Sequence, residues 1–412
     1  MQSAPVAALL LYLCLLACVL SDAARLPLAS KTKKKSSEGS IHLDHACGNW
    51  AAEYTELHRA ILAGEKPPRY AVAMAASGLS DGLTGAATVF LYALVTGRAF
   101  KWHMQNSNHG HLWEGYAQPH VNWTWAADIS PPAWPFKDQD NSALYLRLLN
   151  EVRNNDTQEA ESWFHHKDLR VLGEGYDTVY VWCNRGETWD LFSNPYLKEM
   201  LRAWGMRPET AFGCALNYLL DLPDEVKEHY SDALQALQDR EVLKIGVQIR
   251  TGDATLDKQK ELNLTDFDSF FQCAQEVEDT RAMAYPGGVL WYLVTDSLSL
   301  RHQAEQVYGD KLLVPRAGVV VGHVAKGSHA VKGVDEKAIL QSAALENWLL
   351  GMVDVHIITS ASGFGRTAAF RSLNWGSLYT IDYAPGRPPR QRKCGILDYD
   401  HLEVAAHTFS RI

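Results

Sequence analysis

Short apolar runs alternate with longer amphipathic segments over the second half of the chain, which is the clearest pattern in the sequence. The apolar runs are rich in β-branched residues and bounded by polar ones, which predicts buried strands at residues 243–249, 289–294, 312–314, 355–359 and 378–381. Helical spacing of apolar residues predicts helices between them, at about 266–283, 298–307 and 335–352 and from about 365. Strands that alternate with helices in this way predict a doubly wound parallel sheet.

The first half has a weaker version of the same pattern. Its predicted elements are a helix at 47–63, a strand at 70–74, a glycine-rich turn at 75–85, an Ala-rich helix through residue 95 and a strand at 178–182. Residues 101–170 are rich in Trp, His, Asn and Pro and have little periodicity, which predicts loops. The sequence therefore predicts an α/β fold with two domains that meet near residue 239.

The N-terminus has the pattern of a targeting segment. Residues 6–20 are apolar and uncharged, too short for a comfortable membrane span, and followed by small residues, as in a cleaved signal peptide. A signal-anchor that holds the protein in a membrane is the alternative, because no positive charge precedes the apolar run. The predicted regions are 1–24, signal peptide or signal-anchor; 25–45, flexible basic stem; 46–238, N-terminal domain; 239–385, C-terminal domain; and 386–412, C-terminal tail.

Composition limits the classes of partner. With 412 residues, of which 47% are hydrophobic and 21% charged, the chain is long enough for two or three globular domains. Its formal net charge of -9 argues against nucleic-acid binding, because proteins of that class neutralise phosphates with a clustered excess of Lys and Arg. We therefore expect no nucleic-acid partner, and few and local phosphate contacts.

Cysteine usage and glycosylation sequons favour the secretory pathway. Two of the seven cysteines lie in the leader, and the others are too far apart for a zinc knuckle. In an oxidising compartment they allow up to two disulfides with one thiol left over, and their spacing does not decide the pairing. Sequons at Asn122, Asn155 and Asn263 are consistent with this compartment. The expected location is the secretory pathway, with secretion if the leader is cleaved.

The predicted strand 243–249 stops abruptly at Arg250, which is followed by a glycine turn and Asp253. In open α/β sheets, ligands bind at the C-terminal ends of the strands. A planar and permanently charged guanidinium at such an end is suited to bind a phosphate group bidentately. An ion pair between Arg250 and a nearby carboxylate is the structural alternative.

Polar or glycine-rich segments also follow two later strands, at Thr295-Asp296-Ser297 and at Thr359 to Gly365. Residues 360–365 precede a predicted helix, so their hydroxyls and backbone N–H groups can hold a diphosphate or a ribose. Asp296 can accept hydrogen bonds from a base or a sugar hydroxyl, but an N-cap role explains it equally well. An N-cap role is also the structural alternative for Ser362 and for Asp253. Together these strand ends predict a cleft for a phosphate and a nucleoside.

Histidines and tryptophans are concentrated between residues 102 and 166. No pair of these histidines has the i, i+4 spacing of a zinc site together with a nearby acidic partner, so no metal site is predicted. The tryptophans could stack on sugar rings if exposed, although burial is their usual fate. The tryptophans considered for stacking are Trp102, Trp113, Trp123, Trp125 and Trp134.

Several short motifs follow one another along the chain. They are Gly78-Leu79-Ser80-Asp81-Gly82 with Phe90 to Leu94, Val247-Gln248-Ile249-Arg250, Thr295-Asp296-Ser297, and Thr359 to Gly365. In this order they resemble the motifs of the fucosyltransferase superfamily, most like the plant xyloglucan fucosyltransferases, with the α1,6- and protein O-fucosyltransferases as relatives. The resemblance covers roughly residues 78–381, in short segments separated by unmatched loops. The plant pattern has Asn-Arg after Gly-Leu-Gly, whereas this chain has Ser80-Asp81-Gly82, which lacks the basic group.

The resemblance implies a GT-B architecture of two Rossmann-like domains facing a cleft, with GDP-fucose as donor substrate, inversion at the sugar carbon, and no required metal or cofactor. The N-terminal domain would bind the acceptor, a hydroxyl of a glycan or glycoprotein. Arg250 would hold the β-phosphate and stabilise the leaving diphosphate. Asp253 and Asp81 are the candidate general bases, and Asp253 could instead orient Arg250. The residues expected to contact the donor are Gln248, Arg250, Thr251, Asp296, Ser297, Ser360, Ser362, Gly363, Phe364 and Gly365.

Other functions are alternatives to this one. Asp-X-Asp spacing, which can hold a divalent ion on a diphosphate, would favour a metal-dependent glycosyltransferase of GT-A type. The pairs are Asp138/Asp140, Asp266/Asp268 and Asp398/Asp400, and none of them follows a full predicted strand. A non-catalytic carbohydrate-binding protein on the same scaffold is the second alternative, because a fold does not determine function. A sulfotransferase is less favoured, because the chain has no phosphate loop of the G-x-x-x-x-G-K type.

Overall fold

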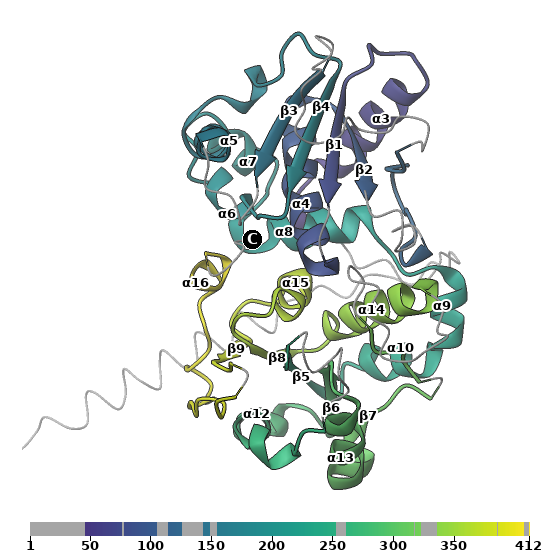
Figure 1. Ribbon diagram of the computed structural model, residues 1–412, viewed down its shortest axis with the longest axis vertical. Helices are drawn as coiled ribbons and strands as arrows, with labels where there is room; N and C mark the ends of the chain where they lie inside the picture. The colour runs from purple at the N-terminus through teal and green to yellow at the C-terminus, as the bar shows by residue number, and fades with distance from the viewer. Residues whose placement is uncertain are drawn as a thin grey trace, which may run out of the picture. The chain divides into compact units, whose positions relative to one another are not determined.

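Two parallel β-sheets, each covered by helices, organise the chain (Figure 1). The computed structural model describes residues 46–75, 78–104, 114–125, 143–148, 155–252, 261–316, 318–322, 336–384, 386–407 and 412. Both sheets lie in one unit of the chain, Leu43–Ile412. The predicted α/β class with two parallel sheets is confirmed. The predicted leader and stem lie outside the described residues, and the predicted division near residue 239 falls between the two sheets.

The second sheet has the strand order β7-β6-β5-β8-β9, and all neighbouring strands are parallel. Its strands are β5 (Leu243–Ile249), β6 (Val289–Thr295), β7 (Leu312–Leu313), β8 (Val355–Thr359) and β9 (Leu378–Ile381). Its helices are α12 (Asp268–Arg281), α13 (Leu298–Tyr308), α14 (Glu336–Leu350) and α15 (Gly363–Arg371). All residues of β5 are buried, as expected for a central strand with helices on both faces. The strands predicted for this half are confirmed.

The first sheet has the strand order β2-β1-β4-β3 and is also parallel. Its strands are β1 (Tyr70–Ala75), β2 (Ala99–Met104), β3 (Ala143–Leu148) and β4 (Thr178–Cys183). Its helices are α3 (Ala51–Leu62), α4 (Leu79–Thr96), α5 (Asn155–His166), α6 (Thr188–Leu191), α7 (Lys198–Ala203) and α8 (Pro208–Leu219). The prediction of strands at 70–74 and 178–182 is confirmed, whereas the prediction of loops throughout 101–170 is wrong for β2, β3 and α5.

The strand β2 was not predicted because polar residues interrupt its apolar ones. Lys101 is only 7% exposed, and its ammonium donates to the backbone carbonyl oxygens of Asn122 at 2.8 Å and Thr124 at 3.2 Å. Burial lowers the pKa of Lys101 to about 8. Since the acceptors come from a segment some twenty residues away, no local pattern could indicate that a lysine belongs in this buried strand.

Helix α4 is the central helix of the first half. It has the length and apolarity of a membrane span, but 89% of its apolar window is buried inside the protein, as in the core helix of a soluble domain. Gly85 allows close packing on β4, because a Cβ there would lie 2.1 Å from the carbonyl oxygen of Cys183. Gly97 ends the helix in the left-handed conformation, with φ of 64°. The small Gly and Ala residues of this segment therefore allow neighbouring elements to pack closely around the helix.

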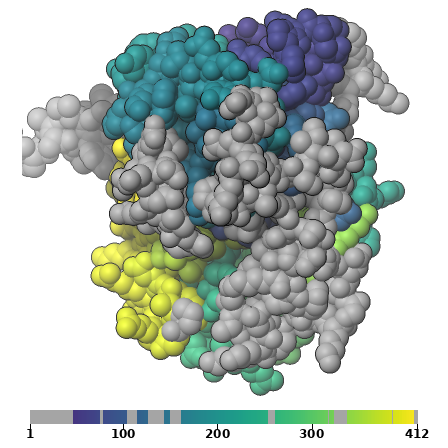
Figure 2. All heavy atoms as spheres, turned by 45° about the horizontal axis from the view of Figure 1, so that its top comes forward, coloured from purple at the N-terminus to yellow at the C-terminus, as the bar shows by residue number. Residues whose placement is uncertain are grey.

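The chain enters the second half before β5, the first strand of that sheet, and leaves it after β9, the last strand. After α8, the helices α9 (Asp224–His229) and α10 (Ser231–Gln238) lead to β5. After β9, the chain returns to the first half, where α16 (Leu402–Ala406) and Ile412 join the core that contains α4 and α8. Figure 2 shows the yellow C-terminal residues beside the teal residues of the first half. The remaining elements are short 3-10 helices: η2 (Leu169–Val171), η3 (Leu264–Phe267), η4 (Ala282–Ala284) and η5 (Gly309–Lys311).

One apolar core extends from the first half into the second. The cluster that contains Leu83 of α4 and Phe212 of α8 also contains Leu340 of α14 and Phe370 of α15. The ring centroids of Phe212 and Phe370 are 6.0 Å apart. At Gly213, an added Cβ would lie 2.4 Å from the carbonyl oxygen of Phe370, so α8 and α15 touch through their backbones. The two sheets therefore belong to halves that share packed side chains.

Each half contains one disulfide. Cys47 is bonded to Cys214 and Cys273 to Cys394, while Cys183 is a buried thiol. The expectation of two disulfides and one remaining thiol is confirmed. Disulfides persist mainly in oxidising compartments, so this pairing supports the secretory location.

Candidate functional site

The predicted strand ends lie side by side in the structure. The central strand β5 pairs with β6 on one side and with β8 on the other, and Ile249 is opposite Thr295. The chain runs from β5 to β6 and β7, and then crosses to β8 and β9 at the other side of β5. The strand order thus reverses between β5 and β8, and such a switch point is where open α/β sheets bind ligands.

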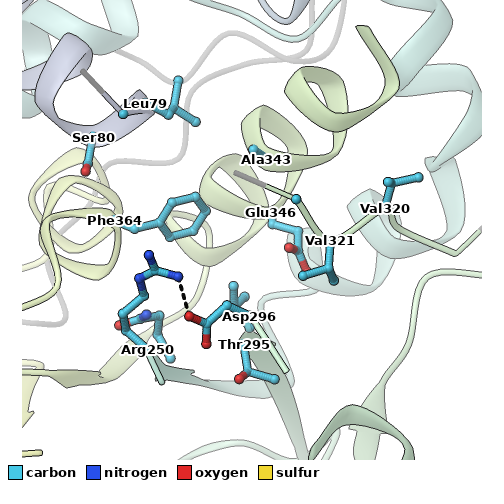
Figure 3. A pocket seen from close by; sticks show the side chains of 14 residues that line it. Leu79, Ser80, Arg250, Thr295, Asp296, Val320, Val321, Ala343, Glu346 and Phe364 are labelled. Atoms are coloured by element: carbon cyan, nitrogen blue, oxygen red, sulfur yellow. Dashed lines mark hydrogen bonds and ion pairs between the residues drawn. The ribbon is translucent and has the colours of Figure 1, made fainter. Parts of the chain in front are cut away.

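A pocket of about 150 Å³ lies at these strand ends (Figure 3). Its walls come from both halves of the molecule. The first half contributes Gly78, Leu79 and Ser80 at the start of α4. The second half contributes the strand ends and the neighbouring helices, with Gln248, Arg250, Val294, Thr295, Asp296, Val320, Val321, Gly322, Ala343, Glu346 and Phe364.

Arg250 lines the pocket directly after the central strand. Its backbone N–H donates to Thr359 Oγ1 at 3.0 Å, which ties the end of β5 to the end of β8. Its guanidinium forms an ion pair with Asp296, and 30% of its side chain is exposed. Figure 3 shows this pair below Phe364. Because a guanidinium has five N–H donors in a fixed plane, it can add a phosphate to the contact that already orients it.

Asp296 holds the turn that follows β5. One carboxylate oxygen accepts from the backbone N–H and the hydroxyl of Thr251, both at 2.8 Å, and the other accepts from the Gly252 N–H at 3.1 Å. Gly252 has φ of 107°, a conformation that favours glycine. The N-cap role considered for Asp296 belongs instead to Ser297, whose hydroxyl accepts from the Leu300 N–H at 3.4 Å. Asp296 is therefore placed to fix the position of Arg250.

The first turn of α15 packs closely on Ser80 and on Gln248. A Cβ at Gly363 would lie 2.9 Å from Ser80 Oγ, and one at Gly365 would lie 2.6 Å from Gln248 Oε1. Ser362 is the N-cap of α15, the structural role considered for it as an alternative to ligand binding. Its hydroxyl oxygen accepts from the Gly365 N–H at 3.4 Å. Ser360 donates its backbone N–H to Ile381 at 3.0 Å. Of the segment 360–365, Phe364 reaches the pocket wall.

Two helix N-termini meet at the pocket. Helix α4 begins after Gly78 with no side-chain cap, and Leu79 and Ser80 line the pocket. Helix α15 begins at Gly363, next to Ser80. The first N–H groups of a helix have no acceptor within the helix, and they carry its positive partial charge. With the guanidinium of Arg250, these two helix ends make the pocket suitable for an anion.

Gln248 presents a buried polar atom at the pocket. The residue is 3% exposed, and its Oε1 has no hydrogen-bond partner among the described residues. A buried carbonyl oxygen without a donor costs free energy, about 1–3 kcal/mol in proteins. A ligand with an N–H or O–H group at this position would remove that cost.

The two candidate general bases are placed differently by the structure. Asp81 lies in the first turn of α4, outside the pocket lining. Burial lowers the pKa of Arg366 on α15 to about 10, and the charge of Asp81 acts in the opposite direction. Asp81 therefore lies near a buried guanidinium of the other half. Asp253 lies outside the described residues.

Glu346 is a pocket residue that sequence reasoning missed. It is 7% exposed and forms an ion pair with Arg301 at 2.6 Å. Arg301 in turn donates to the carbonyl oxygen of Thr295 at 2.7 Å, so Glu346 is connected to the end of β6. Its helix, α14, reads as an ordinary core helix, and a single glutamate in such a helix gives no local signal.

The described acidic pairs with Asp-X-Asp spacing lie away from this pocket. Asp266 and Asp268 are exposed where α12 begins. Asp400 forms an ion pair with Arg392 at 2.7 Å, and Asp398 accepts from the Gly395 N–H at 3.0 Å. The third pair lies outside the described residues. Among the tryptophans, Trp102, Trp123 and Trp125 are buried, which excludes stacking on a sugar, and Trp113 and Trp134 lie outside the described residues.

Two parallel sheets with helices on their faces, and a pocket between the strand ends of one and a helix start of the other, are consistent with the GT-B architecture. No family model matches the sequence, and no curated protein matches it. A solved structure with the same fold is a mutant of Arabidopsis thaliana FUT1 in complex with GDP. It has a TM-score of 0.55 and 17% sequence identity, over 78% of this chain and 76% of that chain.

Two NodZ structures are also similar. The NodZ α-1,6-fucosyltransferase co-crystallised with GDP has a TM-score of 0.44 and 17% identity, over 78% of this chain and 97% of that chain. The fucosyltransferase NodZ from Bradyrhizobium has a TM-score of 0.44 and 16% identity, over 77% of this chain and 96% of that chain. The structural similarity to fucosyltransferases that the motifs predict is thus confirmed at the level of the fold, by the FUT1 structure.

Proposed function

We propose that the protein is a glycosyltransferase that moves L-fucose from GDP-fucose to a hydroxyl of a glycan or glycoprotein, with inversion and without a required metal ion. The observation that carries this proposal is the position of Arg250. It ends the central strand, is oriented by Asp296, and lines a pocket at which two helix N-termini meet. The fold shared with a FUT1 structure, which was solved with GDP, supports the same donor.

Arg250 has the chemistry that departure of the diphosphate requires. As the bond between the sugar carbon and the diphosphate breaks, negative charge grows on the β-phosphate oxygens. Donors that are already oriented stabilise that charge without reorganising, which is the largest single contribution to catalysis in many enzymes. Asp296 fixes the guanidinium beforehand, and the start of α15, where Phe364 lines the pocket, is proposed to add backbone N–H groups. A cationic side chain thus takes the role that a divalent ion has in GT-A enzymes.

The donor contacts are proposed in two groups. Gln248, Arg250, Asp296 and Phe364 line the pocket and are proposed to touch the nucleotide sugar directly. The others act through local structure: Thr251 is bound to Asp296, Ser297 and Ser362 cap helices, and two glycines permit close packing. Within this second group, Ser360, Gly363 and Gly365 are proposed to shape the loop around the diphosphate.

The acceptor hydroxyl must lose a proton as the new bond forms, so the site needs a general base. Asp81 and Asp253 remain the proposed candidates. Asp81 belongs to the half expected to bind the acceptor, whereas Asp253 follows the turn that Asp296 holds. The disulfides support a location in the secretory pathway, where glycan and glycoprotein acceptors occur, and we propose the Golgi lumen.

Thermal shift with a panel of sugar nucleotides tests the proposal. The wild-type protein is melted with GDP, GDP-fucose, GDP-mannose, UDP-glucose and UDP-galactose, each at the same concentration. We expect stabilisation by GDP and GDP-fucose, because a ligand that binds only the native state raises the melting temperature. No response to guanine nucleotides, or an equal response to uridine nucleotides, would contradict the donor assignment. Binding of GDP-fucose without turnover on a glycan array, and without donor hydrolysis, would favour a carbohydrate-binding protein.

A further inference from the structure

Three asparagines of the chain, Asn122, Asn155 and Asn263, are followed two residues later by a threonine. Such a triplet is the acceptor sequence for N-linked glycosylation. A glycan is bulky and hydrophilic, so it fits only where the asparagine lies at the protein surface. Asn122 and Asn263 are both exposed. Of the third, Asn155, the structure describes only the backbone.

Asn122 is the exposed residue of a segment that is otherwise packed beside the first sheet. Its neighbours Val121 and Trp123 are 5% and 0% exposed. The carbonyl oxygen of Trp123 accepts from the Trp102 N–H of β2 at 2.7 Å, which holds the segment on the sheet. The side-chain Oδ1 of Asn122 accepts from the Thr124 N–H at 3.1 Å. This Asx turn uses the oxygen of the carboxamide and leaves its nitrogen on the solvent side of the turn.

Asn263 has the same arrangement in the second half. Its Oδ1 accepts from the Thr265 N–H at 3.2 Å, which makes Asn263 the N-cap of η3. The next residue, Leu264, is buried, and its N–H donates to Gln303 Oε1 on α13 at 2.9 Å. The exposed asparagine therefore begins a short helix that is anchored to the rest of this half.

The carboxamide nitrogen is the atom that glycosylation needs. No hydrogen bond engages Nδ2 of Asn122 or of Asn263 within the described part of the chain. Nδ2 of the buried Asn194, by contrast, donates to the carbonyl oxygens of Phe164 and Lys167 at 2.8 Å and 2.9 Å. The two exposed asparagines can therefore exchange an amide hydrogen for a sugar without losing a contact that the fold uses.

We propose that Asn122 and Asn263 carry N-linked glycans. In the reaction, Nδ2 forms a bond to the anomeric carbon of an oligosaccharide donor. The polyprenyl diphosphate of that donor leaves with the electron pair of the broken C–O bond, and the amide nitrogen releases a proton. The modification takes place in the secretory pathway, a location that the two disulfides support. Glycosylation of these residues thus requires that location, but it does not depend on fucosyl transfer.

The glycan on Asn122 would lie beside the edge of the first sheet. Among the described strands of that sheet, β2 is at the edge, and the segment of Asn122 pairs with it at the bridge between Trp102 and Thr124. Open strand edges can pair with another chain, and a bulky hydrophilic group hinders that approach. Neither Asn122 nor Asn263 lines the pocket, so the glycans are expected to leave donor binding unchanged.

Site occupancy is tested on full-length protein that a eukaryotic host expresses with the protein's own leader. Peptide mass spectrometry measures the modification at each asparagine before and after treatment with peptide:N-glycosidase. We expect glycans on Asn122 and Asn263, and conversion of both residues to aspartate by the enzyme. Asn49 is the internal control, because it is exposed and precedes a tryptophan, as Asn122 does, but has Ala51 in place of the threonine. It should be unmodified.

Asn122→Asp and Asn263→Asp remove the amide nitrogen but keep the oxygen that accepts from the backbone N–H, so both variants should fold. Each is expected to lose only its own glycan, with a melting temperature close to that of the deglycosylated wild-type protein. Thr265→Ala should also lose the glycan on Asn263, whereas Thr265→Ser keeps the hydroxyl and should retain it. Unmodified Asn122 or Asn263 in the wild-type protein would overturn the assignment, as would a glycan on Asn263 that survives Thr265→Ala. None of these measurements uses sugar transfer by the protein itself, so the result is independent of the proposed function.

Discussion

The two walls of the pocket differ in how they are built. The wall from the second half is charged and internally bonded: Asp296 holds Arg250, Thr251 and Gly252 in place. The wall from the first half presents the start of α4, where Gly78 and Leu79 offer backbone groups and small or apolar surface. The charged wall is suited to grip one fixed group of a ligand. The other wall is suited to shape the space in front of it, so donor binding and acceptor selection are expected to separate between the two.

The largest effect is expected from Arg250→Ala on the charged wall. Removal of an oriented donor to developing negative charge costs about 10²–10³-fold in kcat, and we expect the upper end here together with weaker GDP binding. Arg250→Lys should not restore activity, because lysine lacks the planar fork. Initial rates, GDP titration and melting temperature measure this. Arg316→Ala, an exposed arginine of the same half, is the control. Normal GDP affinity in a folded Arg250→Ala protein would remove Arg250 from the site.

The carboxylates test the division between the walls. If Asp81 is the general base, Asp81→Asn should lower kcat by about 10²-fold or more and leave GDP affinity unchanged. If Asp253 only orients Arg250, Asp253→Asn should lose donor affinity and rate together. Steady-state kinetics with GDP titration separate the two outcomes, and the fully exposed Asp224→Asn is the control. Normal turnover in Asp81→Asn would show that the start of α4 serves packing alone.

Gln248→Met should change stability and binding in opposite directions. The substitution removes the buried Oε1 that has no partner among the described residues, so we expect the ligand-free protein to gain about 1 kcal/mol. Loss of that acceptor should weaken GDP-fucose binding by roughly tenfold. Denaturant unfolding and donor titration measure both quantities. Gln272→Met, at an exposed position of α12, should change neither. A destabilised variant with unchanged donor affinity would contradict a ligand role for Gln248.

The smallest effect is expected from a chelator. Because Arg250 supplies the positive charge at the diphosphate, turnover in EDTA should stay within about twofold of the untreated rate at a temperature well below melting. Loss of turnover that Mn²⁺ or Mg²⁺ restores would favour the metal-dependent alternative.

The sequence alone predicted the parts of the site that depend on local pattern. The run 243–249 reads as a buried strand because β-branched residues recur in it and polar residues bound it. The polar segments at 250, 295–297 and 359–365 directly follow the predicted ends of three strands. Parallel strands bring their C-terminal ends to the same edge of a sheet, whatever the conformation of the loops between them. The pattern of apolar residues was therefore sufficient to predict the second sheet and the residues at its strand ends.

Long-range contacts account for what the sequence did not predict. Lys101 lies in a buried strand because carbonyls from residues 122 and 124 receive its ammonium. Asp296 can form its ion pair with Arg250 because β5 pairs with β6, and no spacing of residues in the sequence predicts that pairing. Glu346 and the disulfide partners are likewise brought together by the fold. In each case the chemistry depends on a residue far away in the chain, and local composition carries no information about it.

The apolar core that runs from α4 and α8 into α14 and α15 has a consequence for how the protein unfolds. If each half had a separate core, one could melt while the other stayed intact, and calorimetry would record two transitions. With Leu83 and Phe212 packed in the same cluster as Leu340 and Phe370, the loss of either half exposes apolar surface of the other. The described part of the chain is therefore expected to melt in a single cooperative transition, with calorimetric and van't Hoff enthalpies that agree.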